Sequence, residues 1–220
     1  MQHLLNKLQL AGRGFYALPL VCAALTLALW LLNTSGRQGE ATAQNLVYEI
    51  YKGNSHIGEM TAVRQQKGDS TTIAINSKVA FRVLFEVNIL MDYLTCYRGG
   101  KLHTSLHTYH FNGKLKERLL VEHFGDHYQI TDRDGEISRL EAARLPYALG
   151  SMYFGEPPAG TTKVFSERFA QILNLREKED GVWELEMPDG KTNIYRYKNG
   201  VCHHVEVDHM LATLYFKRKL

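Results

Sequence analysis

The sequence lacks the motifs from which catalytic and cofactor sites are usually recognised. It has no Gly-x-Ser-x-Gly elbow, no His-Glu-x-x-His helix, no phosphate loop and no dinucleotide fingerprint. Proline and cysteine are also scarce, with five and three in 220 residues. We therefore predict no catalytic residue and no cofactor.

A large excess of one charge is missing too. Without residues 1–43, Lys plus Arg falls from 26 to 23 and Asp plus Glu from 23 to 22, so the remainder carries a formal net charge of +1. Nucleic-acid binding requires clustered basic side chains, and the basic run here is the terminal Lys217-Arg218-Lys219. We predict no nucleic-acid partner.

The ten histidines do not form a metal-binding pattern. His103 and His107 would share one strand face about 13 Å apart, which is too far for both to bind one ion. Cys202, His204, Glu206 and Asp208 alternate on another face with neighbours about 7 Å apart, so at most two of them could bind one ion together. We therefore predict no metal site.

The three cysteines leave two interpretations open. Cys22 follows Val21, which is too large for a lipoprotein signal, so we exclude lipidation there. Cys96 and Cys202 could pair in an oxidising compartment, or each could be a small apolar residue of a sheet.

Residues 1–43 have the pattern of a targeting segment. Lys7 and Arg13 precede an uncharged apolar run at residues 15–32, and Ala41-Thr42-Ala43 offers a cleavage site that lies far from that run. Eighteen apolar residues can just span a bilayer. We expect either a cleaved signal peptide or an inner-membrane anchor through residues 15–32. Both place residues 44–220, a single β-rich envelope domain, in the periplasm or otherwise outside the cytoplasm.

Nine two-residue turn signals divide the chain after residue 50. Glycine tolerates positive φ, and Asn and Asp adopt it more readily than other residues, so each pair favours a β-hairpin. The pairs are Gly53-Asn54, Gly68-Asp69, Gly99-Gly100, Asn112-Gly113, Gly125-Asp126, Asp134-Gly135, Asp180-Gly181, Asp189-Gly190 and Asn199-Gly200. The segments between them alternate apolar and polar residues, as half-buried strands do.

One alternating segment, residues 73–93, is too long for a single strand. Its odd positions are almost all apolar, and extended it would span roughly 70 Å, more than twice the width of such a domain. We place a bend or turn at residues 82–86, with both halves facing one core. The other predicted strands are 46–52, 57–65, 101–111, 115–124, 127–131, 136–140, 162–178 with an irregularity at 166–168, 182–187, 192–198 and 201–217 with a break near Met210.

The pattern predicts an all-β fold. Antiparallel strands with short turns make a meander, and a sheet of about ten twisted strands curls. We expect a strongly curved open sheet or incomplete barrel, with one short helix near residues 146–154 that begins at Pro146. Such a sheet would have an apolar concave face. Its ligand-lining candidates are Val79, Phe81, Phe85, Ile89, Tyr93, Tyr195 and Tyr197, while Glu184, Arg196, Glu206 and Asp208 would face outward.

The polar triplet Ser166-Glu167-Arg168 lies between Phe165 and Phe169. In one interpretation, Glu167 and Arg168 pair at the surface while the two Phe side chains pack. In the other, Arg168 meets an acidic head group at the mouth of the sheet, because its planar guanidinium suits carboxylate or phosphate. Arg168 is the leading polar candidate for a ligand contact.

Four stretches carry a resemblance to a known family. They are Ile57-Gly58-Glu59, KVFSERF at 163–169, MPDGKTNIYRY at 187–197 and NGVCHHVEV at 199–207. From about residue 46 onward the chain resembles an uncharacterised family of exported β-rich bacterial proteins, a domain of unknown function. The resemblance implies a β-rich envelope domain similar in general shape to periplasmic lipoprotein carriers. It implies no activity, substrate or catalytic residue.

Three functions follow as hypotheses. The leading one is a non-catalytic envelope protein that binds or carries a lipid, an acyl chain or a lipidated partner in its curved sheet. The second is a structural or interaction module that attaches an envelope protein. The third is a hydrolase or metal enzyme that uses His203, His204 or Glu206.

Overall fold

The computed structural model describes residues 41–82, 84–145, 147–209 and 212–220, which form fourteen β-strands and one 3-10 helix, η1 (Leu149–Tyr153). The strands are β1 (Thr42–Lys52), β2 (Ser55–Lys67), β3 (Ser70–Arg82), β4 (Glu86–Arg98), β5 (Lys101–Phe111), β6 (Lys114–Phe124), β7 (His127–Thr131), β8 (Ile137–Leu140), β9 (Lys163–Ser166), β10 (Gln171–Glu179), β11 (Val182–Glu186), β12 (Thr192–Lys198), β13 (Val201–His209) and β14 (Ala212–Arg218).

All fourteen strands belong to one antiparallel sheet in the order β8-β7-β6-β5-β4-β3-β2-β1-β14-β13-β12-β11-β10-β9. Every neighbour in this order is a neighbour in sequence except β1 and β14, which pair from Tyr48↔Arg218 to Lys52↔Leu214. Strands β8 and β9 are the two edges, so the sheet stays open. The expected open, nearly all-β meander is confirmed, with fourteen strands rather than about ten.

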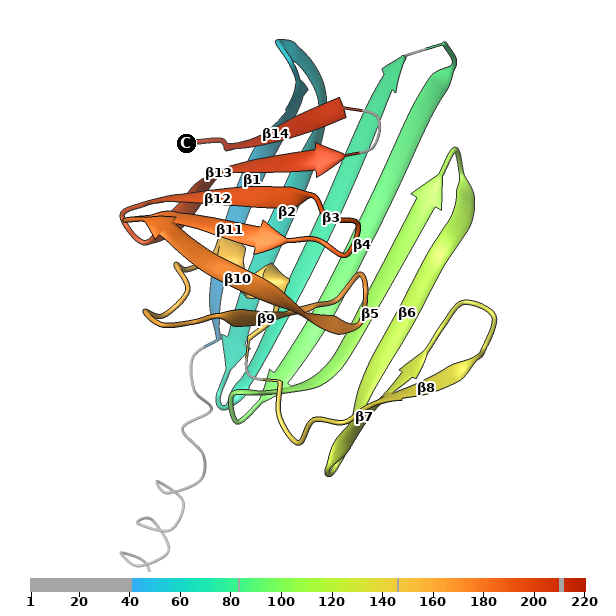
Figure 1. Cartoon of the computed structure of the whole chain (residues 1–220), viewed down its shortest axis with the longest axis vertical. Helices are drawn as coiled ribbons and strands as arrows, with labels where there is room; N and C mark the ends of the chain where they lie inside the picture. Colours follow the sequence, from blue (N-terminus) through green and yellow to red (C-terminus); the bar gives the residue numbers. More distant parts are fainter. Residues whose placement is uncertain (1–40, 83, 146, 210–211) are drawn as a thin grey trace, which may run out of the picture. The chain divides into compact units, whose positions relative to one another are not determined.

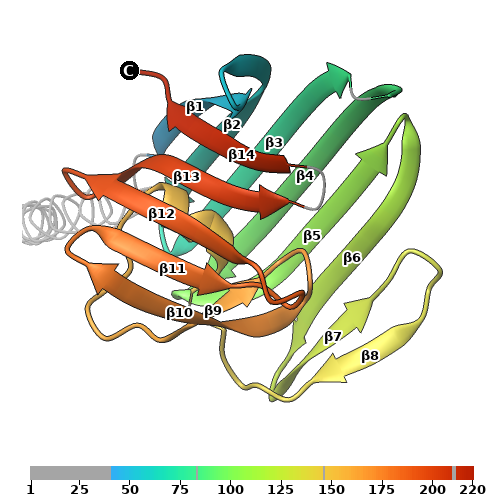
Figure 2. The ribbon, with the colours of Figure 1, turned by 45° about the horizontal axis from the view of Figure 1, so that its top comes forward.

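The sheet folds over on itself. Strands β1–β8 form one layer, and β9–β14 cross in front of it at an angle, with η1 between the two (Figure 1). The rotated view shows the same crossing (Figure 2). The curvature follows from the twist of successive strands, which accumulates across so many of them.

The predicted hairpins are confirmed at all nine turn signals, each of which lies between two consecutive strands. At Asn112-Gly113 and Asn199-Gly200 both residues have positive φ, 50° and 77° in the first pair and 53° and 72° in the second. This backbone conformation matches the twist of the flanking strands, which explains the Asn-Gly sequence.

The long alternating segment is a hairpin, as predicted. Strand β3 ends at Arg82 and β4 begins at Glu86, and the two pair along their whole length from Ser70↔Arg98 to Arg82↔Glu86. On both strands the odd-numbered apolar side chains face the core, among them the buried Ile75, Val79 and Ile89.

Two strands stand where the sequence predicted one irregular strand at 162–178. Strand β9 pairs with β10 from Gln171↔Ser166 to Asn174↔Lys163. The chain reverses between them, and Ala170 there has a φ of +50°. Alanine rarely adopts this conformation, so no turn signal marked the reversal.

The helix expected near 146–154 is present as η1, although Pro146 itself lies outside the described residues. The segment before η1 connects the two layers. The backbone N–H of Leu102 on β5 donates to the carbonyl of Leu145 at 3.1 Å, and the N–H of Phe165 on β9 donates to the carbonyl of Tyr147 at 3.0 Å. Met152 of η1 is fully buried, so η1 covers one end of the interior.

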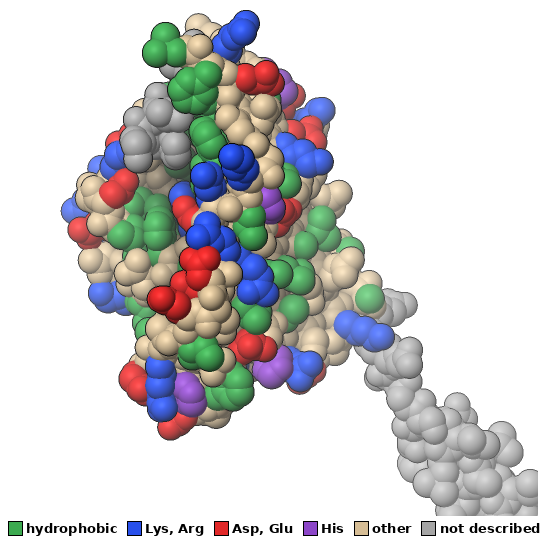
Figure 3. Space-filling model, turned by 90° about the vertical axis from the view of Figure 1, so that its right-hand side faces the viewer, with side chains coloured by type: hydrophobic (Ala, Val, Ile, Leu, Met, Phe, Trp, Pro, Cys, Tyr) green, Lys and Arg blue, Asp and Glu red, His purple; other side chains and the backbone are tan. Residues whose placement is uncertain are grey.

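The outer surface carries both signs of charge. On the face shown in Figure 3, Lys and Arg side chains are interspersed with Asp and Glu side chains. Glu184, expected to face outward, forms ion pairs with Arg176 and Lys178 on the outer face. The expected break near Met210 and nearly all of the expected targeting segment at 1–43 lie outside the described residues. Among the residues that are described, no helix is long and apolar enough to cross a membrane.

Candidate functional site

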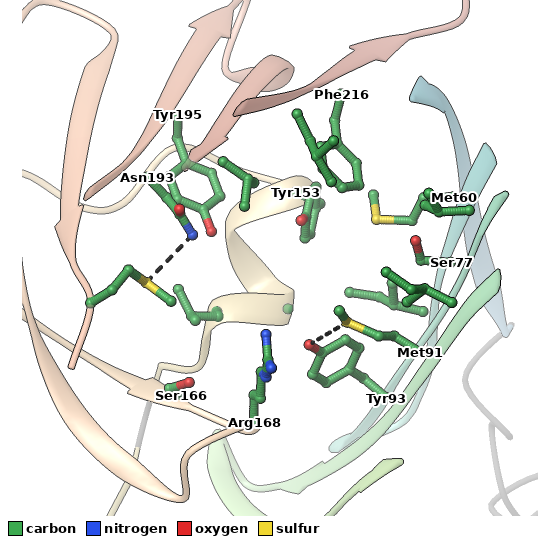
Figure 4. Close-up of a pocket in the computed structure, with 18 of the residues that line it drawn as sticks. Met60, Ser77, Met91, Tyr93, Tyr153, Ser166, Arg168, Asn193, Tyr195 and Phe216 are labelled. Atoms are coloured by element: carbon green, nitrogen blue, oxygen red, sulfur yellow. Dashed lines mark hydrogen bonds between the residues drawn. The ribbon is translucent and has the colours of Figure 1, made fainter. Parts of the chain in front are cut away.

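A cavity of about 140 Å³ lies between the two layers of the folded sheet (Figure 4). Its wall is mostly apolar. The side chains come from β2–β4 (Met60, Ile75, Val79, Ile89, Met91 and Tyr93), from η1 (Leu149 and Tyr153) and from the second layer (Phe169, Met187, Tyr195, Val207, Leu214 and Phe216). This is the concave apolar face that the sequence predicted.

Five of the eight predicted lining residues lie at this cavity. They are Val79, Ile89, Tyr93, Arg168 and Tyr195. Their contact with a ligand stays a prediction.

The other three, Phe81, Phe85 and Tyr197, do not line this cavity. Phe85 belongs to the turn between β3 and β4 and is 56% exposed. Phe81 lies near the end of β3, where the ammonium group of Lys52 is 4.7 Å from its ring centre. Tyr197 follows an irregularity in the pairing of β12 with β13, and its hydroxyl donates to the carbonyl of Met152 at 2.8 Å, so it packs against η1.

Two buried polar side chains at the cavity were not predicted. Ser166 is fully buried and Asn193 is 6% exposed, and neither Ser166 Oγ nor Asn193 Oδ1 has a hydrogen-bond partner in the described structure. The Asn193 Nδ2 donates weakly to the Met187 sulfur at 3.4 Å. The sequence did offer one signal for Asn193. It is two residues from Tyr195 on the same strand, so both side chains lie on the inward face.

Arg168 lies in the turn between β9 and β10, and its side chain points into the cavity (Figure 4). Its guanidinium holds Glu117 with two hydrogen bonds, Nε to Oε2 at 3.2 Å and Nη2 to Oε1 at 3.3 Å. The same guanidinium lies over the rings of Tyr109 and Phe169. The expected surface pair of Glu167 and Arg168 is therefore wrong, because Arg168 binds a carboxylate 51 residues away.

Glu117 is held in its charged form. His107, whose Nε2 is 3.5 Å from Glu117 Oε2, and the hydrogen-bonded Arg168 together lower the pKa of Glu117 to about 2. The imidazole of His107 is fully buried and stacks on the ring of Tyr93 with centroids 4.6 Å apart. The positive charge of Arg168 is thus already compensated inside the protein.

Glu167 is buried beneath η1. Its Oε1 accepts hydrogen bonds from the backbone N–H of Gly150 at 3.0 Å and from Thr95 Oγ1 at 3.4 Å. Burial raises the pKa of this carboxyl to about 7. A Cβ on Gly150 would lie 2.9 Å from the same oxygen, so the Glu167 carboxylate would have to shift to accept a larger residue there.

The groups considered for metal or hydrolase chemistry do not form a cluster of potential metal ligands in the described residues. In the described residues no group of three or more His, Cys, Asp or Glu side chains could hold a metal ion. His203 Nδ1 is 2.9 Å from the Arg196 carbonyl. Cys96 and Cys202 are free thiols, and burial raises the pKa of Cys202 to about 12, which leaves it unreactive at neutral pH.

The fold has a solved counterpart. The chain is similar to a β-barrel-like protein with a domain of unknown function, DUF1849, from Brucella abortus, with a TM-score of 0.54 and 12% sequence identity over 80% of this chain and 94% of that chain. At this identity the likeness concerns the fold alone.

No curated protein matches the sequence. Residues 48–219 match the family described as a domain of unknown function (DUF6134). This match confirms the expected uncharacterised β-rich family, and the chain belongs to DUF6134.

Proposed function

We propose that this β-barrel-like domain is a non-catalytic binding protein of the cell envelope that holds an apolar ligand between the layers of its folded sheet. The ligand is a lipid, an acyl chain or the lipid of a modified partner protein. The cavity carries the proposal. The envelope location rests on the basic and apolar pattern of residues 1–43.

The size of the cavity is suited to a small apolar molecule or to the end of a longer apolar chain. Protein cores are normally packed without voids larger than a water molecule. An engineered apolar cavity of about 150 Å³ binds benzene, and the cavity here has about 140 Å³. At about 24 cal/mol per Å³, leaving it empty costs on the order of 3 kcal/mol of stability, which a bound apolar group would recover.

The proposal is tested by lipid extraction and by a titration. The full chain is expressed and purified without added lipid, extracted with organic solvent and analysed by mass spectrometry, and an apolar fluorescent probe is then titrated into it. We expect a co-purified apolar molecule or micromolar probe binding. If both measurements are blank, the binding function is wrong and the domain is better explained as an interaction module.

A matched pair of variants locates the bound probe. Val207→Phe places a larger side chain in the cavity wall, whereas Val63→Phe adds the same bulk on the outer side of β2. We expect probe affinity to fall at least about tenfold in the first variant and to stay unchanged in the second, because only the first fills the cavity. Equal affinities would place the probe elsewhere.

A further inference from the structure

We propose that the cavity selects an electrically neutral ligand whose buried end carries a hydrogen-bond donor, either a hydroxyl or an N–H group. This inference rests on the proposed binding function and names the class of ligand for that site. Three features of the wall carry it: two unpartnered oxygen atoms, a compensated positive charge and a small volume.

The unpartnered oxygen atoms are Ser166 Oγ on β9 and Asn193 Oδ1 on β12. A buried acceptor without a donor costs free energy, so native structures leave few of them. The Asn193 oxygen can only accept a hydrogen bond, and the Ser166 hydroxyl can accept or donate one. A ligand that donates a hydrogen bond would satisfy the Asn193 oxygen.

The charges near the cavity disfavour an anionic ligand. Arg168 is the cationic side chain of the wall, and both of its observed hydrogen bonds go to Glu117. A carboxylate or phosphate would have to displace Glu117 or approach it closely. Glu167, beneath Gly150, adds a second acidic group close to the wall. This arrangement replaces the sequence-based expectation that Arg168 meets an acidic head group.

The volume limits what can enter. A space of about 140 Å³ accepts a single ring or a short alkyl group. A phenol and a short alcohol both combine that size with one hydroxyl donor. A longer ligand would place only such an end group in the cavity.

Three probes of similar shape separate these features. They are p-cresol, which is neutral with one donor, p-xylene, which is neutral without a donor, and benzoate, which is an anion. Each is titrated into the purified full chain at pH 7.5 by calorimetry and by NMR. We expect p-cresol to bind about tenfold more tightly than p-xylene, the effect of one additional buried hydrogen bond, and benzoate to bind most weakly.

Two variants of the cavity wall test whether Asn193 and Ser166 cause the preference for p-cresol over p-xylene. Asn193→Leu removes the acceptor with little change in volume, and Asn45→Leu, at an exposed position of β1, is its control. Ser166→Ala, with the exposed Ser138→Ala as its control, gives a second measurement in case Asn193→Leu folds poorly. We expect the ratio of the p-xylene and p-cresol dissociation constants to fall about tenfold in Asn193→Leu, to fall in Ser166→Ala and to stay constant in both controls.

The outcomes distinguish this inference from the binding function itself. If p-xylene and p-cresol bind equally, if the ratio is unchanged in both cavity variants, or if benzoate binds most tightly, the cavity binds ligands but the selection proposed here is wrong. If none of the three probes binds and lipid extraction is also blank, the binding function fails together with the inference.

Discussion

The buried carboxyl of Glu167 couples the stability of the fold to pH. Burial raises its pKa from the ordinary value of 4.5 to about 7, so between these values the folded protein keeps a proton that the unfolded chain has released. The free energy of unfolding therefore falls as pH rises through this window, by up to about 3 kcal/mol. Above pH 7 this contribution no longer changes.

The variant Glu167→Gln tests this coupling. Glutamine keeps an oxygen to accept the Gly150 N–H but does not ionise, so the stability of the variant relative to wild type should rise between pH 4.5 and 7 and then level off. Urea unfolding at four pH values measures the difference. The exposed Glu136→Gln should show no such trend, and a flat profile for Glu167→Gln would contradict the assignment.

The sequence identified the Ser166-Glu167-Arg168 triplet as important but assigned the wrong partners. Phe165, expected to pack, is indeed buried. The partners of Glu167 and Arg168 come from distant strands, Thr95 on β4 and Glu117 on β6. Spacing along the chain cannot predict such pairs, because they depend on how the sheet folds over.

Among the strands, the contact between β2 and β3 contains one glycine at which any added side chain would collide with the neighbouring backbone. Gly58 pairs with Val79, and a Cβ built on it would lie 2.0 Å from the Lys78 carbonyl oxygen. Because this oxygen belongs to the backbone, the clash can be relieved only if the two strands separate. The contact explains why glycine stands inside a strand, where it is otherwise unfavourable.

We expect Gly58→Ala to lower the free energy of unfolding by more than about 2 kcal/mol, because the added methyl group overpacks a backbone contact. The matched control is Gly155→Ala, where a Cβ would have no neighbour within 4 Å. Urea denaturation of both variants gives the comparison. A loss below about 0.5 kcal/mol for Gly58→Ala would show that the strands can adjust freely.

Strand positions could be predicted wherever residues in the turn itself marked the reversal of the chain. Gly and Asn at the hairpins located most strand ends to within a few residues, and the period of two located the turn between Arg82 and Glu86 without any glycine. The reversal at Ala170 was missed because no Gly, Asn or Asp stands in the turn between β9 and β10. Phe85 was also misplaced. The alternation of apolar and polar residues continues through the turn between β3 and β4, but the turn exposes the Phe85 side chain to solvent.

At the scale of the whole molecule, the open curved sheet and its apolar hollow could be predicted from strand number and twist. The pairing of β1 with β14 could not, because it joins the beginning and the end of the domain and leaves no local pattern. That pairing determines which side chains meet across the hollow. Tyr48 on β1, for example, donates its hydroxyl to the carbonyl of Cys202 on β13 at 2.7 Å.

Because β1 and β14 pair in the middle of the sheet, the edge strands β8 and β9 follow each other in the chain. The architecture is therefore a circular permutation of a simple meander that would run from β9 to β14 and on through β1 to β8. A permuted chain with a linker from Arg218 to Thr42 and new ends at the exposed Ala159 and Gly160 would have every strand paired with a neighbour in sequence.

Lower contact order speeds folding, so we expect this permutant to refold at least about tenfold faster than residues 42–220 in their natural order, as measured by stopped-flow tryptophan fluorescence. Equal rates would show that joining the two ends is not the slow step. In the natural order, β14 is the last strand of the domain in sequence and completes the sheet at its centre. The two halves of the domain therefore cannot close over the cavity before β14 has been synthesised.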